Sequence, residues 1–256
     1  MASALVRGVL QAGVCQPQAV WASDCFFELA QKLASDTGLQ AVRSNLEVAE
    51  ASQTLLLCVK PQDSLSALVE LRAALEGKLV VSIAAGVSLA ALEGAAGPGV
   101  RIIRVMPNTP ALVHKGASAY ALGTHATPAD AEVVLALFGA VGFAAQVKEG
   151  LLDAVTGLSG SGPAYAFLMI EALADAGVLM GLSRDLSVKL AAQTLAGAAE
   201  MVLQTGEHPG KLRDAVASPG GTTIAGIEAL EASGVRAGLI SAVRKAAERS
   251  REMGKE

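Results

Sequence analysis

The sequence predicts an α/β half followed by an all-helical half. Before about residue 150, short apolar runs of strand character alternate with Ala- and Leu-rich segments of helical periodicity. Such alternation is typical of a mostly parallel, doubly wound sheet with helices on both faces. After residue 150, helical patterns continue without a run of strand character. We therefore expect two domains, residues 1–150 and 151–256.

The first half contains six predicted strands, because each run is short, apolar and bounded by turn-forming residues. They are Ala19–Ala22, Thr54–Val59, Leu79–Ile83, Arg101–Val105, Ala117–Ala121 and Phe143–Val147. Apolar residues recur at helical spacing in the segments around them. These predicted helices are Ser3–Ala12, Phe26–Thr37, Asn45–Ala51, Ser64–Leu75, Leu89–Leu92 and Pro128–Val141.

The second half is predicted to be helical throughout. Its expected helices are Leu151–Thr156, Gly162–Met180, Ser183–Thr205, Lys211–Ala217, Thr222–Ala232 and Val235–Met253. The longest uncharged stretch, Ala154–Ile170, is interrupted by Gly157, Gly160, Gly162 and Pro163. A membrane-spanning helix needs about 20 consecutive apolar residues, so we expect none here.

Composition narrows the class of protein. The 256 residues suffice for two modest domains with a full core. Hydrophobic residues make up 52% and charged residues 17%, so we expect other subunits to cover part of the apolar surface. A net charge of −4 without a basic cluster argues against nucleic acid as a partner. The N-terminal residues carry no secretory cleavage pattern, and the three cysteines show no ligand spacing, which favours the cytoplasm.

Three loops follow successive predicted strands. They contain Val59-Lys60-Pro61, Ala84-Ala85-Gly86 and Pro107-Asn108-Thr109. Ligands of open α/β sheets bind outside the carboxyl ends of the strands, so the three loops predict a cleft in which small residues permit close approach by a flat ligand. Each loop taken alone is more often just an ordinary strand–loop junction, and it is the succession of three that favours a cleft.

Residues 216–224 read Val-Ala-Ser-Pro-Gly-Gly-Thr-Thr-Ile and lead into a predicted helix. The Pro-Gly-Gly sequence predicts a tight turn, and Thr222 is expected to cap the helix. The free N–H groups of such a helix N-terminus suit a small carboxylate or phosphate. An ordinary capped helix after a loop fits the same residues.

A second Ser- and Gly-rich segment, Thr156–Tyr165, lies among apolar helices, and its Pro163 suits the first turn of a helix. His114, His125 and His208 share no ligand spacing with carboxylates, so a metal site is not expected. A Ser-His-Asp hydrolase is also disfavoured, because no Gly-x-Ser-x-Gly sequence sits at a strand-to-helix elbow.

Together, these motifs resemble the pyrroline-5-carboxylate reductase family. The matching blocks occur in the family's order: Val59–Pro61, Ser82–Val87, Met106–Pro110, Gly157–Tyr165, Gly206–Gly210 and Ser218–Thr223. The resemblance implies a Rossmann-like dinucleotide-binding domain and a helical substrate-binding and dimerisation domain. It also implies hydride transfer from NADPH or NADH to the cyclic imine of 1-pyrroline-5-carboxylate, which gives L-proline in the last step of proline biosynthesis. Family members form at least homodimers, and the dimers assemble into decamers.

The resemblance assigns roles to residues at both ends of the chain. Thr223 would lie near the imine nitrogen as the catalytic residue. The substrate-binding residues would be Val216, Ser218, Gly220, Gly221, Thr222, Thr223 and Pro163. The nicotinamide and its ribose would lie against Val59, Lys60, Pro61, Ala84, Ala85 and Asn108. Ser23 and Asn45 would approach the adenosine ribose or its 2′-phosphate, but the Asp24 carboxylate beside them favours an unphosphorylated ribose, so the choice of cofactor stays open.

One departure from the family concerns the N-terminus. The family begins with a strand and a Gly-x-Gly turn that cradles the pyrophosphate, whereas Met1–Gly8 resembles the helix after that turn. We therefore expect the first strand to be missing, either through an internal start or in a shortened chain. The alternative function is a cofactor-incompetent relative that acts as a non-catalytic or regulatory subunit. A β-hydroxyacid-type dehydrogenase or a ketopantoate-like reductase is disfavoured. Such enzymes typically use a lysine on the first long helix of the second domain, and Gly162–Met180 contains no lysine.

Overall fold

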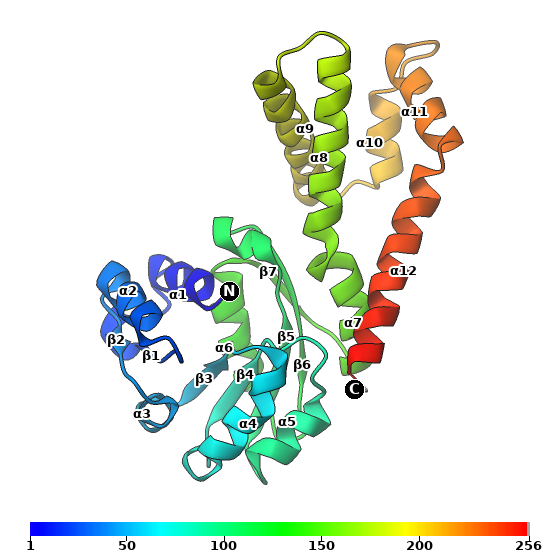
Figure 1. The fold of residues 1–256 in the computed structure, drawn as a ribbon. Coiled ribbons are helices and arrows are strands. Elements are labelled where there is room, and N and C mark those ends of the chain that lie inside the picture. Colours follow the sequence, from blue (N-terminus) through cyan, green and yellow to red (C-terminus); the bar gives the residue numbers. More distant parts are fainter. Residues whose placement is uncertain (255–256) are drawn as a thin grey trace. The chain divides into compact units, whose positions relative to one another are not determined.

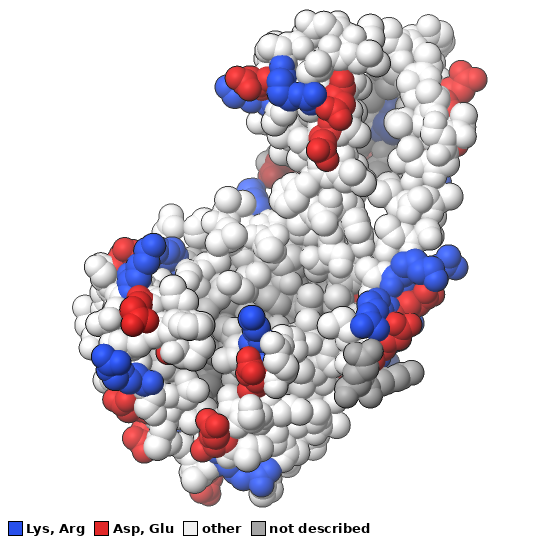
Figure 2. All heavy atoms as spheres, viewed as in Figure 1, with Lys and Arg blue, Asp and Glu red and all other residues white. Residues whose placement is uncertain are grey.

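The computed structural model describes residues 1–254 and divides them into two compact units (Figure 1). Unit 1 comprises residues 1–161 and 244–254, and unit 2 comprises Gly162–Val243. An α/β unit followed by helices confirms the predicted fold class. The domain boundary at residue 150 stays a prediction. On the face drawn in Figure 2, small groups of charged side chains of both signs are separated by broad uncharged areas.

Unit 1 contains a five-stranded sheet in the order β3-β4-β5-β6-β7 and a separate pair, β1-β2. The strands are β1 (Trp21–Ala22), β2 (Gln40–Ala41), β3 (Thr54–Leu57), β4 (Leu79–Ser82), β5 (Arg101–Met106), β6 (Gly116–Leu122) and β7 (Gly142–Gln146). Every pairing is parallel except that of β5 with β6. The sequence did not predict β2, because two residues are too few to show an alternating pattern.

The helices of unit 1 follow the predicted order. They are α1 (Ala2–Gln11), α2 (Phe27–Thr37), α3 (Asn45–Ala51), α4 (Pro61–Leu71), α5 (Leu89–Ala96), α6 (Pro128–Gly139) and α7 (Leu152–Val155). Helix α4 begins three residues before the expected Ser64, because Pro61 occupies its first turn, where a missing N–H costs nothing. Helix α5 continues four residues beyond the expected Leu92.

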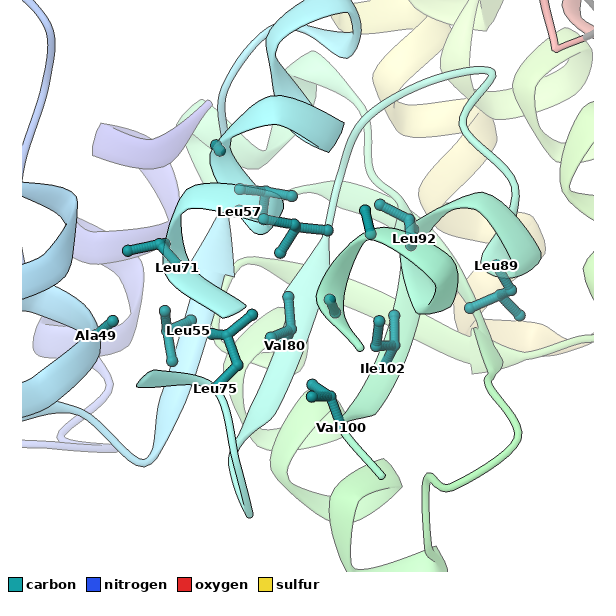
Figure 3. Close-up of a cluster of buried hydrophobic side chains, with 14 of the residues drawn as sticks. Ala49, Leu55, Leu57, Leu71, Leu75, Val80, Leu89, Leu92, Val100 and Ile102 are labelled. Carbon is teal, nitrogen blue, oxygen red and sulfur yellow. The ribbon is translucent and has the colours of Figure 1, made fainter. Parts of the chain in front are cut away.

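Both faces of the larger sheet are packed with apolar side chains. On one face, α4 and α5 cover alternate residues of β3, β4 and β5, including Leu55, Val80 and Ile102 (Figure 3). On the other face, α1 and α6 cover the intervening residues, and Phe138 of α6 is fully buried there. This two-residue alternation is what a sheet covered on both faces requires.

Unit 2 is built from helices only within the residues described. They are α8 (Gly162–Leu179), α9 (Arg184–Thr205), α10 (Pro209–Ala215), α11 (Thr222–Ala232) and the first part of α12 (Val235–Met253). Helices α8 and α9 pack closely: a Cβ added at Gly177 would lie 2.6 Å from the Ser187 hydroxyl. The buried residues of unit 2 are Ala174, Ser187 and Ala191.

Two helical runs, Glu149–Leu179 and Arg184–Thr205, are long and apolar enough to cross a membrane by length and composition alone. Only 6% and 11% of their apolar windows are buried within the chain. The glycines between residues 157 and 162 were expected to interrupt the first run, but residues 156–160 instead form a π-helical turn. A wider turn keeps the chain helical there. The exposed apolar surface therefore needs an explanation.

Candidate functional site

The three loops predicted to form a cleft all lie at one edge of the sheet. Strands β3, β4 and β5 are parallel. Leu57 and Ser82, the last residues of β3 and β4, lie opposite each other, and Ser82 lies opposite Arg104, two residues before the end of β5. Val59 and Lys60, which follow β3, are exposed, and Pro61 begins α4. Parallel pairing thus gathers the backbone of these loops at the edge where such sheets bind ligands.

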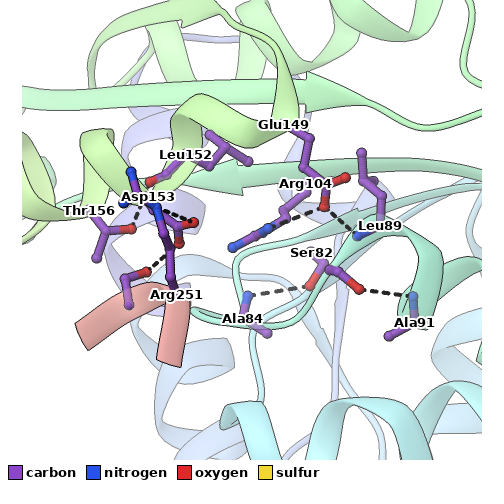
Figure 4. Close-up of polar contacts among 12 residues, drawn as sticks. Ser82, Ala84, Leu89, Ala91, Arg104, Glu149, Leu152, Asp153, Thr156 and Arg251 are labelled. Atoms are coloured by element: carbon purple, nitrogen blue, oxygen red, sulfur yellow. Dashed lines mark hydrogen bonds and ion pairs between the residues drawn. The ribbon is translucent and has the colours of Figure 1, made fainter. Parts of the chain in front are cut away.

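The loop after β4 is held in shape by its own side chains and by the C-terminal helix. Ser82 Oγ accepts a hydrogen bond from the backbone N–H of Ala84 at 3.3 Å (Figure 4). Gly86 has a φ of +77°, which side chains disfavour. A Cβ at Gly86 would lie 3.6 Å from Cβ of Met253. The Ala84–Gly86 segment is therefore packed against the end of α12.

The side-chain amide of Asn108, which the resemblance placed against the nicotinamide, is hydrogen-bonded within unit 1. Asn108 is 8% exposed. Its Nδ2 donates to the carbonyl of Ser159 at 3.0 Å, and its Oδ1 accepts from the N–H of Ala117 at 2.9 Å. The side chain therefore fastens the π-helical turn, Thr156–Gly160, to the end of β5. A Cβ added at Gly160 would lie 2.7 Å from Cε of Met106, so this turn packs closely against the Met106 side chain.

Two acidic residues that the sequence did not single out fix neighbouring segments. Glu149 pairs with the largely buried Arg104 at 3.2 Å and accepts the N–H of Leu89 at 2.6 Å (Figure 4). Asp153 accepts the hydroxyl of Ser250 at 2.7 Å and thereby anchors the last turns of α12. Arg104 was the sequence signal for the Glu149 contact. It is a charged residue inside an apolar strand, and a buried charge needs an oppositely charged or hydrogen-bonding partner.

Ser23 and Asn45, the residues expected near the adenosine, lie together. Ser23 Oγ donates to Asn45 Oδ1 at 2.7 Å. Asp24 turns back on its own loop, where its Oδ1 accepts the N–H of Phe26 at 2.9 Å. The two predicted ribose-side residues therefore form one polar cluster after β1, with the Asp24 carboxylate held by the backbone.

The Ser-Pro-Gly-Gly segment of unit 2 forms a tight turn before α11. The N–H of Gly221 donates to the carbonyl of Ser218 at 3.0 Å, and Gly220 has a φ of +66°. Pro at the second and glycine at the third position are typical of a type II turn. A Cβ at Gly221 would lie 2.3 Å from Ser218 Oγ, so the hydroxyl sits directly against this glycine.

The sequence predicted Thr222 as the N-cap of α11, and this prediction is wrong. Gly221 occupies that position in an extended conformation, its carbonyl accepts from Ala225 N at 3.4 Å, and Thr222 is the first helical residue. No side-chain hydrogen bond from the described residues caps this end. The N–H groups of Thr222 and Thr223 therefore have no carbonyl one turn earlier to bind. Both threonines are exposed.

The two remaining substrate-side residues lie on other elements of unit 2. Val216 ends α10 and is 62% exposed. Pro163 lies in the first turn of α8. Among residues 1–254, no group of three His, Cys, Asp or Glu gathers as metal ligands. Burial raises the pKa of the Cys58 thiol, next to Val59, to about 11, so it stays neutral at physiological pH.

Comparisons with known proteins cover the whole chain. Residues 149–253 match the profile described as pyrroline-5-carboxylate reductase dimerisation, and residues 1–86 match the profile described as NADP oxidoreductase coenzyme F420-dependent. The chain is 49% identical to the pyrroline-5-carboxylate reductase of Methanosarcina acetivorans, over 100% of this chain and 95% of that protein.

Solved structures agree with the sequence comparisons. The pyrroline-5-carboxylate reductase of Coxiella burnetii superposes with a TM-score of 0.94 at 32% identity, over 98% of this chain and 94% of that one. The pyrroline carboxylate reductase of Plasmodium falciparum, with NADP bound, superposes with a TM-score of 0.88 at 35% identity and the same coverage.

Proposed function

The chain belongs to the pyrroline-5-carboxylate reductase family, and on that basis we propose that it reduces 1-pyrroline-5-carboxylate to L-proline with NADPH or NADH. The observation that carries the proposal is the turn before α11, where Ser218 and two exposed threonines meet the unpaired end of an eleven-residue helix. An anionic, five-membered substrate fits such a site, because its carboxylate is attracted by free N–H groups and the helix dipole.

We infer that the substrate carboxylate accepts hydrogen bonds from Ser218 Oγ and from the N–H groups of Thr222 and Thr223. The N–H of Gly221 is already used within the turn, so this glycine and Gly220 contribute shape. Val216 and Pro163 would border the ring. This arrangement would hold a small anion in one orientation. Fixing the orientation of a reactant accelerates a reaction, because the entropy of positioning it is lost before the chemical step.

Thr223 is assigned the catalytic role. Its hydroxyl is exposed at the start of α11 and would accept a hydrogen bond from the N–H of the protonated ring nitrogen. Reduction adds a hydride to the imine carbon, on the other side of the nitrogen from the carbon that bears the carboxylate, and leaves an N–H at the nitrogen. An imine that arrives protonated already carries that proton, so the site needs no histidine or carboxylate pair to supply it.

The residues at the sheet edge suit a dinucleotide. When bound, the reduced nicotinamide supplies the hydride. Val59, Lys60 and Pro61 would hold the nicotinamide half together with Ala84 and Ala85, whose small side chains leave the backbone accessible. We assign Asn108 a positioning role, since both ends of its amide are occupied within unit 1.

We also propose that unit 2 forms a homodimer through the exposed apolar faces of α8 and α9. Their apolar surface lies in the segment that matches the dimerisation profile, and covering it is favourable by about 25 cal/mol per Å². Assembly of dimers into a decamer and a cytoplasmic location remain predictions.

The test is steady-state oxidation of NADPH and NADH with 1-pyrroline-5-carboxylate by the full chain. Thr223→Ala should lower kcat by about 10- to 100-fold, and Ser218→Ala should mainly raise the KM for the imine. Ser35→Ala, an exposed position on α2 of unit 1, is the control and should leave both constants unchanged. A dimeric wild-type chain without activity would instead favour the non-catalytic subunit. An active Thr223→Ala variant with normal kcat would remove this residue from the mechanism.

A further inference from the structure

An arginine at the β1–β2 edge stands out because an aromatic ring holds it in place. The Arg43 guanidinium carbon lies 4.1 Å from the centre of the Phe27 ring. Stacking of a guanidinium on an aromatic face is favourable, because the ring carries a negative quadrupole on that face. It also restricts a side chain that would otherwise sample many rotamers. Arg43 is therefore partly pre-organised on the surface.

The strand pairing brings Arg43 next to the Ser23–Asn45 pair. The N–H of Val42 donates to the carbonyl of Ala22 at 2.9 Å, so the residues that follow, Arg43 on one strand and Ser23 on the other, leave the same edge of the β1–β2 sheet. Asn45 lies two residues beyond Arg43 and bonds Ser23 at 2.7 Å. A cation, a hydroxyl and an amide are thus gathered at the carboxyl ends of two parallel strands.

The acidic residues of this edge are occupied elsewhere. Asp24 accepts the N–H of Phe26 at 2.9 Å, and Glu47 accepts the N–H of Ser44 at 3.2 Å within a capping box. Among residues 1–254, no carboxylate lies within ion-pair distance of Arg43. The guanidinium therefore keeps its fork of donors available for an anion that is not part of the chain.

We propose that Arg43, oriented by Phe27, binds the 2′-phosphate of the adenosine and makes this chain select NADPH over NADH. The inference rests on the proposed function only in that a nicotinamide dinucleotide is bound. A guanidinium matches two phosphate oxygens in a bidentate pair, and an arginine near this strand end accommodates a 2′-phosphate where a lone acid would repel it. The Asn45 amide N–H groups supply further donors, whereas the Ser23 hydroxyl already donates to Asn45 Oδ1. Asp24 opposes the same phosphate and limits the selectivity.

The direct test measures binding without catalysis. Calorimetric titration would compare adenosine 2′,5′-bisphosphate with AMP on the wild-type chain and on Arg43→Gln, Arg43→Lys and Lys32→Gln. Lys32 lies on α2, the helix that carries Phe27, and its loss removes one charge without touching the cluster. The wild-type chain should prefer the bisphosphate by about tenfold or more, since a charge-assisted hydrogen bond contributes about 1.5–3 kcal/mol.

Arg43→Gln should abolish that preference, and Arg43→Lys should retain part of it. Lys32→Gln should keep it within about twofold, because Lys32 is exposed and its charge is screened by solvent and salt. Phe27→Leu should weaken bisphosphate binding by about threefold, in line with a lost cation–π contact, while AMP binding is unchanged. Equal loss in Arg43→Gln and Lys32→Gln would reduce the effect to net charge and overturn the proposal. So would a wild-type chain that binds the two nucleotides equally.

Failure of this inference is distinguishable from failure of the proposed function. If Arg43→Gln binds the bisphosphate as well as the wild type but the chain still reduces 1-pyrroline-5-carboxylate, Arg43 is not the selector and the activity stands. If bisphosphate selectivity depends on Arg43 while no imine reduction is found, the phosphate site stands and the substrate assignment fails.

Discussion

In unit 1, helices of the same chain cover both faces of the β3–β7 sheet, whereas in unit 2 the long helices α8 and α9 leave most of their large apolar side chains exposed. Phe138 of unit 1 is 0% exposed and Leu168 of unit 2 is 65% exposed. Since apolar burial is the dominant favourable term in folding, unit 1 carries its own core. Unit 2 does not bury these side chains by itself, which agrees with its match to a dimerisation profile.

The largest expected effect comes from the core of unit 1. Phe138→Ala removes a fully buried ring between α6 and the sheet and should lower the free energy of unfolding by about 3–5 kcal/mol. Leu135→Ala on the same helix is the matched control: that side chain is 42% exposed and its loss should cost less than about 1 kcal/mol. Urea unfolding followed by circular dichroism measures both. Equal losses would mean that this face of the sheet is not a closed core.

This core was predictable because a covered sheet imposes its alternation on the sequence. The bounds of α11 and the start of α12 were equally predictable from the sequence. Gly221 directly precedes α11, and Gly234 lies between the end of α11 and the start of α12. The two-residue strand β2 was not predictable, because it carries no periodic signal. Nor was the bond from Asn108 to Ser159, which joins residues 51 positions apart. The motifs predicted which loops would gather at the sheet edge. They did not predict that the Asn108 amide would hydrogen-bond the π-helical turn.

The second prediction contrasts exposed apolar residues in the two units. Leu168→Glu on α8 places a charge in the face proposed to be covered by a second copy, so it should weaken the dimer by about 100-fold or more, from lost burial and an unpaired charge. Val69→Glu on α4 of unit 1, where the side chain is 56% exposed, should leave the dimer intact. Light scattering across a dilution series measures the mass of each. A Leu168→Glu chain that stays dimeric at nanomolar concentration would contradict the assigned face.

The smallest effect separates the two units by how they titrate. In unit 1, burial raises the pKa of the Cys58 thiol from 9.0 to about 11. The unfolded chain then loses its proton first as the pH rises, so this contribution to stability is complete below pH 9 and falls as the pH approaches 11. In unit 2, the exposed ion pair with Arg236 lowers the pKa of Glu231. Any contribution of this pair to stability would be lost at acidic pH instead, and solvent screening keeps that contribution small.

Cys58→Val should therefore flatten the alkaline slope of the free energy of unfolding between pH 9 and 11. Glu231→Gln should leave the free energy of unfolding at acidic pH nearly unchanged. Urea midpoints at each pH measure both slopes, with Cys25→Val, which replaces an exposed thiol, as the control. An alkaline slope that survives in Cys58→Val would show that water reaches this thiol and that the end of β3 is less closed than the rest of unit 1.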